Sequence, residues 1–244
     1  MSAVILNRLL RAPDEIAAAC REDRDVRAIA ATSLIALALG GAVFGGVIGS
    51  FRGGVQIAYA AIKVPLALTA TLALCVPAFH GIAAGLGRPF PIRTIVALAL
   101  AAAGRASLVL LALAPMLWLV FDHGLGYHSA ALVSAFAYAA AGAAAFSVMV
   151  RGLGEGAGRW LTAIAFAGVF FAVGGQASWI LRPYLIRPRT WQASQAHAQK
   201  VPFLRGYEGS FADSIYQSSR SARDIYDVRA EEQGEGLRGE GVSP

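Results

Sequence analysis

One arginine in the chain needs a chemical explanation more than any other residue. Arg105 falls in the middle of a thirty-residue apolar segment, Ile92–Phe121. A charged side chain at the centre of a bilayer costs about 2.5–3.5 kcal/mol on insertion scales. No acidic residue lies within an apolar segment to pair with it, which leaves carbonyls at helix kinks, Gln176, Tyr138 or a bound anion as partners. The functional interpretation is therefore an anion or lipid-headgroup site inside a helical bundle.

Two structural alternatives stay open for Arg105. Its side chain could extend along the helix surface to a nearby interface. Alternatively, the true span is only Ala106–Phe121, and Ile92–Gly104 forms a surface or re-entrant helix. A re-entrant segment would also change the number of membrane crossings.

Three more polar side chains could belong to such a site. Gln176 follows two glycines near the end of the last apolar segment, where a glutamine usually bonds across to another helix. Lys63 and Arg182 each stand close to a proline at an expected helix end, where a cation can bind acidic lipid headgroups. The polar or lipid-headgroup residues that we expect are thus Arg105, Gln176, Lys63 and Arg182.

The sequence predicts no catalytic, cofactor or metal site. His80, His123 and His128 fall at expected span ends and lack the spacing of metal ligands. The glycine-rich stretch from Gly152 to Gly158 follows no strand and precedes no Lys-Ser/Thr pair, so it does not predict a nucleotide site. No serine, cysteine or carboxylate arrangement fits catalysis, and we expect a protein that is not an enzyme.

The composition requires a membrane around these residues. Hydrophobic residues make up 57% of the 244 and charged residues only 15%, against about 45–50% and roughly 25% in soluble domains. The net charge of +6 comes without a basic helix or aromatic platform, which excludes nucleic acid as the expected partner. The sequence predicts an all-α polytopic bundle of about five spans, near residues 28–50, 55–81, 92–121, 129–150 and 160–181.

The first span carries a face without side chains. Gly41, Gly45 and Gly49 are spaced four residues apart, which lets another helix approach to backbone contact. The spacing predicts helix packing. The partner could be a helix of the same chain or the same face of a second copy.

Polar segments flank the bundle, which extends over residues 28–183. In residues 1–27, Pro13 followed by two acids predicts the start of a short helix from Asp14 to about Arg27, lying against the membrane surface. Residues 184–244 form a polar tail, with a weakly amphipathic docking segment at Phe211–Val228 and a composition typical of disorder from about residue 230.

Basic residues give an expected orientation. With five spans, the N-terminal side carries seven flanking arginines and the opposite side five flanking basic residues, so the N-terminus is expected in the cytoplasm. The basic cluster after the last span would itself prefer the cytoplasm, which requires an even number of crossings. The two sets are Arg21, Arg24, Arg27, Arg88, Arg93, Arg151 and Arg159, against Arg52, Lys63, Arg182, Arg187 and Arg189.

Three stretches carry a resemblance. They are Lys63-Val64-Pro65-Leu66 leading to Leu74-Cys75-Val76-Pro77; Trp179-Ile180-Leu181-Arg182-Pro183-Tyr184 after Gly175-Gln176; and Arg205-Gly206-Tyr207-Glu208-Gly209-Ser210-Phe211. Together, over roughly Lys63 to Tyr216, the chain resembles a group of uncharacterised bacterial multi-pass membrane proteins, similar in layout to the Yip1-type five-span domain. The resemblance implies a helical bundle in a bacterial inner membrane with a cytoplasmic N-terminus. It implies no activity, and the longer tail departs from that layout.

Two functions follow as hypotheses. The first is a non-enzymatic membrane protein that organises or scaffolds partners in the bilayer, as a homo-oligomer or in a larger complex. The second is a small oligomeric transporter or channel that uses Arg105 and Gln176. An enzyme acting on lipids lacks any acid, base or nucleophile in this sequence.

Overall fold

Seven helices make up the part of the chain that the computed structural model describes. That part comprises residues 3–51, 54–88, 90–123, 127–156 and 158–181, with only the backbone described at 127, 128 and 178–181. The helices are α1 (Ala3–Arg11), α2 (Pro13–Arg21), α3 (Val26–Ser50), α4 (Gln56–Gly85), α5 (Ile92–Asp122), α6 (Tyr127–Gly152) and α7 (Arg159–Leu181).

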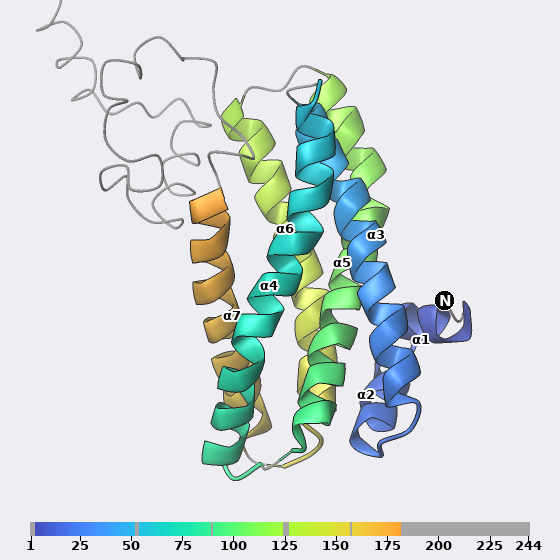
Figure 1. The fold of residues 1–244 in the computed structure, drawn as a ribbon, viewed down its shortest axis with the longest axis vertical. Coiled ribbons are helices and arrows are strands. Elements are labelled where there is room, and N and C mark those ends of the chain that lie inside the picture. The colour runs from blue at the N-terminus through green and yellow to red at the C-terminus, as the bar shows by residue number, and fades with distance from the viewer. Residues whose placement is uncertain (1–2, 52–53, 89, 124–126, 157, 182–244) are drawn as a thin grey trace, which may run out of the picture.

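Five of these helices, α3 to α7, are long and apolar enough to cross a membrane. They run alternately up and down, joined by short links, with α7 at one edge of the bundle and α1 and α2 at the opposite edge (Figure 1). The expectation of an all-α bundle with about five spans is confirmed. At 1.5 Å per residue, the 30 residues of α4 and the 31 of α5 extend for about 45 Å, longer than the ~30 Å of hydrocarbon. Tilt accommodates such an excess.

The spans differ from the sequence-based bounds mainly in α4. Pro65 and Pro77 both lie inside this helix, which continues to Gly85 instead of ending near residue 81. Proline in a helix interior removes the N–H that would bond to the carbonyl four residues earlier. One turn after Pro65, the hydroxyl of Thr69 donates to the carbonyl of Pro65 itself at 2.8 Å.

The N-terminal segment folds differently from the expected single helix over Asp14–Arg27. The corresponding helix, α2, ends at Arg21, and the chain reverses through Asp23 and Asp25, which adopt left-handed φ angles of 58° and 54°. Aspartate is among the few residues that adopt this conformation at modest cost. The preceding helix α1 was not expected, and it projects crosswise to α3 (Figure 1).

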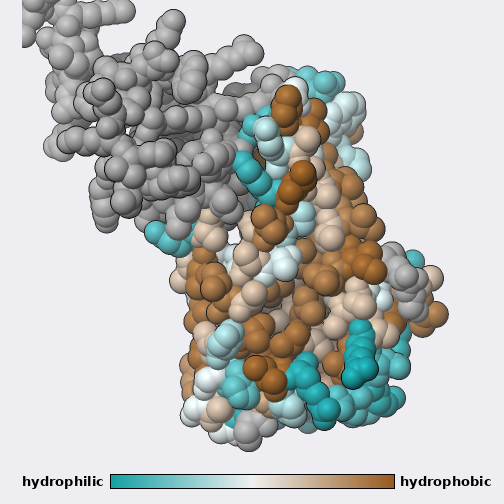
Figure 2. Space-filling view, in the orientation of Figure 1, coloured by the Kyte–Doolittle hydropathy of each residue, from teal (hydrophilic) through white to brown (hydrophobic). Residues whose placement is uncertain are grey.

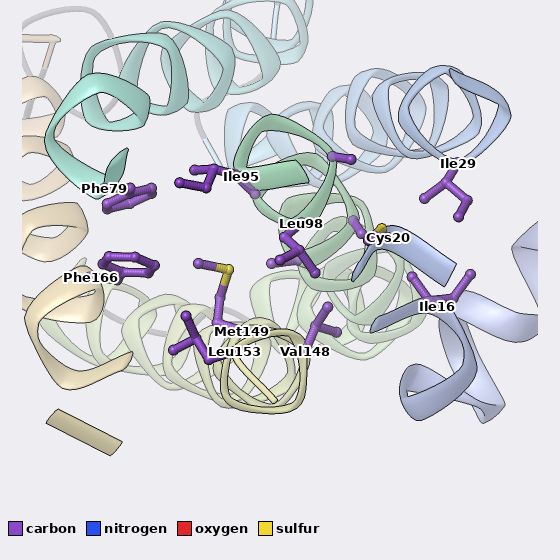
Figure 3. Close-up of a cluster of buried hydrophobic side chains, with 14 of the residues drawn as sticks. Ile16, Cys20, Ile29, Phe79, Ile95, Leu98, Val148, Met149, Leu153 and Phe166 are labelled. Carbon is purple, nitrogen blue, oxygen red and sulfur yellow. The ribbon is translucent and has the colours of Figure 1, made fainter. Parts of the chain in front are cut away.

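Helix α2 lies against the bundle rather than on a membrane surface by itself. Its Ile16 and Cys20 are fully buried, and they join a cluster that includes Ile29 of α3, Leu98 of α5 and Val148 of α6 (Figure 3). The same cluster extends to a stacked pair formed by Phe79 of α4 and Phe166 of α7. A second, smaller cluster holds the other ends of α3, α5 and α6 together; its buried members are Phe44, Ile48, Leu110, Ala114, Leu117, Ala137 and Ala141.

Candidate functional site: a charged junction between α2, α5 and α6

Charged side chains gather where α2 meets the ends of the spanning helices. Figure 2 shows hydrophilic residues beside α2 and the lower end of α3, next to a largely apolar face. Arg151, in the last turn of α6, pairs with Asp14 in the first turn of α2 at 2.5 Å, and Arg21 donates to the carbonyl of Arg151. Arg93 at the start of α5 pairs with Asp23 at 2.9 Å. These contacts join the N-terminal segment to the bundle.

Arg105 belongs to this junction. It lies on α5, which is one continuous helix from Ile92 to Asp122, so Ile92–Gly104 is not a separate re-entrant segment. Its side chain is partly buried, and its charge interacts with those of Asp14 and Arg151. The snorkelling alternative and the functional interpretation both fit this position, since the guanidinium has reached a charged neighbourhood.

One guanidinium nitrogen of Arg105 lacks a protein partner. Its Nη1 is buried and has no hydrogen bond among the described residues. A buried donor without an acceptor costs about 1–3 kcal/mol, and more when the group is charged. Asp14 is bound to Arg151, and the charge of Arg105 interacts with this pair without forming an ion pair of its own among the described residues. The junction therefore has a donor and a positive charge in excess.

The sequence did not point to Asp14 and Arg151 as part of this site. Asp14 was interpreted as a helix-start acid and Arg151 as a loop arginine. Because they are 137 residues apart, no local pattern reveals their pairing. A clue was present in the absence of any acid inside the spans, which requires the partner of Arg105 to come from outside them.

The other expected polar residues do not join Arg105. Gln176 lies on α7 with its side chain exposed, and α7 packs on α4 and to a lesser extent on α6, at the far edge of the bundle from α2 (Figure 1). Lys63, on α4, has its ammonium group 5.5 Å from the ring centre of Tyr59. Arg182 lies outside the described residues.

The glycine face of α3 is occupied within the chain. A Cβ added at Gly41 would lie 3.2 Å from Pro65, and one at Gly49 would lie 2.7 Å from the carbonyl oxygen of Gln56. A Cβ at Gly45 would meet the carbonyl oxygen of Ala60. The partner of this face is therefore α4.

A second close approach, between α3 and α5, was not expected. A Cβ at Gly40 would meet the carbonyl oxygen of Ser107, and one at Gly104 would lie 2.9 Å from Cα of Ser33. The two helices therefore touch along their backbones. The sequence pattern singled out neither glycine, because Gly40 lies outside the four-residue spacing of the α3 face and Gly104 has no glycine partner at that spacing on α5.

The glycine-rich stretch after α6 links two turns of the bundle. Arg88, from the α4–α5 link, donates to the carbonyl of Leu153 at 2.5 Å and to that of Glu155 at 3.3 Å. Gly154 and Gly156 have positive φ angles of 72° and 120°, which glycine adopts without steric cost. Among the described residues, this stretch follows a helix and not a strand.

Histidine and cysteine side chains are dispersed in the described part of the chain. His123 bonds through Nδ1 to the carbonyl of Leu119 at 2.7 Å, His80 lies on α4, and the side chain of His128 is outside the description. Within the described residues, no three His, Cys, Asp or Glu side chains come together as metal ligands. Cys20 and Cys75 are both free and buried.

Comparisons with protein-family models, with curated proteins and with solved structures find no match. The classification therefore rests on the fold itself. Five helices of sufficient length and hydropathy, in an up-and-down bundle, make this chain a multi-pass integral membrane protein in contact with lipid.

Proposed function

We propose that this protein is a non-enzymatic membrane protein that organises partners in the bilayer, and that a helix of a partner protein docks along α7. The observation that carries this proposal is the exposed face of α7. In the most apolar 18-residue stretch of Arg159–Ala177, only 17% of the residues are buried, against half in the corresponding stretches of α3 and α5. A helix held on one side only has most of its surface free for a neighbour.

The exposed face of α7 has features of a helix-packing surface. Leu161, Ile164, Gly168, Ala172 and Gln176 are all exposed and follow one another at intervals of three or four residues, hence on one face. A Cβ at Gly168 would meet nothing within 4 Å. Two small residues four apart allow close approach of another helix, and a glutamine beyond them can hydrogen-bond across the contact.

Photocrosslinking in native membranes tests the docking. A photoreactive residue at Ile164, on the face, is compared with one at Leu66, an exposed position of α4. We expect a discrete protein adduct from position 164 and none from position 66. The adduct should disappear in Gly168→Leu, because the leucine side chain would keep another helix from approaching closely at this position. Adducts with lipid alone at both positions would contradict docking at α7.

Transport would need Arg105 and Gln176 to line one pathway. Arg105 lies on α5 and interacts with charges of α2 and α6, whereas Gln176 lies exposed on α7, which packs chiefly on α4; this separation supports the organising role over the transporter hypothesis. Purified protein in liposomes provides the decisive assay. Solute flux that Arg105→Leu abolishes would replace the organising role with transport.

For the location, we propose a bacterial inner membrane with the N-terminus in the cytoplasm, as the resemblance to uncharacterised bacterial multi-pass membrane proteins implies. The junction end of the described bundle carries Arg88 in the α4–α5 link, Arg93 at the start of α5, Arg151 in the last turn of α6 and Arg159 at the start of α7, besides the arginines of the N-terminal segment. Lys and Arg near span ends favour the cytoplasmic side. That distribution supports the proposed orientation.

A further inference from the structure

We propose that Arg105 and Arg151 bind a phosphate oxyanion at the junction of α2, α5 and α6, with Asp14 holding Arg151 in place. A phosphodiester in an anionic lipid headgroup and free inorganic phosphate share this chemistry. The site is independent of any docking at α7, because it lies on the other edge of the bundle.

Three helices bring the site together. Helix α2 packs chiefly on α6 and also contacts α5, while α5 and α6 pack extensively on each other. Arg105 comes from α5, Arg151 from the last turn of α6 and Asp14 from the first turn of α2. The fold therefore places the Arg151 guanidinium against the Asp14 carboxylate, and it brings Arg105 to the same junction on a helix that packs against both α2 and α6.

The neighbouring acids are already engaged. Oδ2 of Asp14 lies 2.5 Å from Nη1 of Arg151, and Oε2 of Glu15 lies 2.7 Å from Nε of Arg8. Arg21 adds a third guanidinium, which donates to the carbonyl of Arg151. Nη1 of Arg105 is left buried and without a partner among the described residues, so an acceptor with negative charge would satisfy it.

A phosphate satisfies this buried donor better than a single neutral acceptor does. A guanidinium presents a planar fork of N–H donors that matches two phosphate oxygens, and two arginines can hold one phosphate together. A second carboxylate would balance the charge, but the acids of the first turn of α2 are both paired.

The neighbouring surface favours a lipid as the source of the phosphate. Helix α1 contacts α5 and exposes Val4 and Leu10 to 66% and 45%, beside the basic Arg11. Exposed apolar residues with flanking arginine are typical of a helix at the boundary between headgroups and acyl chains. A phospholipid seated there could place its phosphate at Arg105 and its acyl chains along the spanning helices.

The test uses the full chain, purified and exchanged into nanodiscs containing phosphatidylglycerol, phosphatidylcholine or both, with retained lipid counted by native mass spectrometry. We expect the wild type to retain one phosphatidylglycerol in preference to phosphatidylcholine. Arg105→Gln should weaken this binding at least tenfold, and the matched control Arg93→Gln, whose arginine pairs with Asp23 on the surface, should not.

A second arm separates the two sources of phosphate. Inorganic phosphate is titrated into protein in phosphatidylcholine nanodiscs and followed by competition with phosphatidylglycerol. Retained phosphatidylglycerol that phosphate does not displace identifies a lipid site, and binding of phosphate alone identifies a free-phosphate site. Both outcomes support the proposal.

Two results would overturn it. One is a folded Arg105→Gln variant that binds phosphatidylglycerol as the wild type does, and the other is a wild type that binds neither ligand selectively. If Arg105→Gln does not fold, Arg105→Lys decides, because it keeps the charge and removes the fork. We expect Arg105→Lys to bind severalfold more weakly, and unchanged binding would contradict the proposed role of the guanidinium.

Discussion

The contact between α3 and α5 and the attachment of α7 represent two ways of packing helices in a membrane. Along α3 and α5, Gly40 and Gly104 let the two backbones touch, and half of the most apolar stretch of each helix is buried. Helix α7 is held by side chains, chiefly the stack of Phe166 on Phe79 at 4.7 Å. Lipid is as apolar as a leucine side chain, so close packing rather than hydrophobicity decides which helices stay together. Small residues therefore mark the fixed part of the bundle.

The largest effect is expected from Gly40→Leu. The new side chain would overlap the carbonyl of Ser107, which is backbone and cannot move aside. Overpacking costs about 1–3 kcal/mol when side chains can adjust, and we expect about 3 kcal/mol or more here. Unfolding in mixed micelles of increasing SDS content measures the loss. The control Gly81→Leu, with nothing within 4 Å, should change the midpoint little.

Phe166→Ala tests the looser attachment. The ring is 3% exposed and stacks on Phe79, but lipid chains can replace part of the lost contact. We therefore expect about 1–2 kcal/mol, below the 3–5 kcal/mol usual for a water-soluble core. Cysteines introduced at Thr71 and Gly174, which lie close together, should crosslink more slowly in Phe166→Ala than in the otherwise wild-type protein, because α7 is less firmly attached to α4. The packing of α3 on α5 should not change. If Phe166→Ala loosened α3 and α5 as much as α7, the contrast between the two kinds of packing would be wrong. Phe171→Ala, at a ring 63% exposed, serves as the control.

A smaller effect is expected at the junction. Asp14→Asn removes the charge that pairs with Arg151, and because both side chains are largely exposed we expect only about 0.5–1 kcal/mol. The thiol of Cys20, on the buried face of α2, reports the undocking of this helix. In a Cys75→Ala background, maleimide should label Cys20 a few times faster in Asp14→Asn. Glu22→Gln, which affects only the pair with Arg24, should leave the rate unchanged.

The pH dependence of that labelling is the finest test. Burial raises the pKa of Cys20 from 9.0 to about 11, while the charge of Arg21 acts in the opposite direction. The folded state favours the neutral thiol of Cys20. The contribution of this buried thiol to the stability of the folded protein is therefore complete below pH 9 and is lost as the pH rises toward 11. Labelling of folded protein should thus show a midpoint near pH 11, and that of unfolded protein one near 9. A midpoint near 9 in the folded protein would mean that α2 is not docked.

The sequence predicted the spans well because hydropathy is a local property. All five expected spans begin within two residues of the observed helices, and the glycine face of α3 was visible from spacing alone. The sequence did not predict which helix meets that face, because both α4 and a second copy fit a bare surface. It also missed the left-handed turn at Asp23 and Asp25, since nothing in a run of charged residues separates a turn from a continuing helix.

Of the residues at the candidate site, the sequence pointed to Arg105 but not to its neighbours. Arg105 was recognisable because an arginine inside an apolar segment is costly wherever it lies. Its neighbours Asp14 and Arg151 come together only when the N-terminal segment folds back along α6, and no spacing in the sequence contains that information. Gln176 was expected near Arg105 because both are polar residues in apolar segments, but the fold puts them on helices that are not neighbours.

The most direct measurement is topology mapping by cysteine labelling in intact cells, in a Cys20→Ala, Cys75→Ala background, with single cysteines at Gly54, Gly87, Gly124, Gly154 and Ser218. The five-span bundle, with the N-terminus in the cytoplasm as proposed above, predicts that an impermeant reagent labels cysteines at positions 54, 124 and 218 from outside, while those at 87 and 154 react only after permeabilisation. Labelling of Ser218 on the same side as Gly87 would contradict five crossings. Labelling of Gly87 and Gly154 on opposite sides would contradict the paired turns that Arg88 joins.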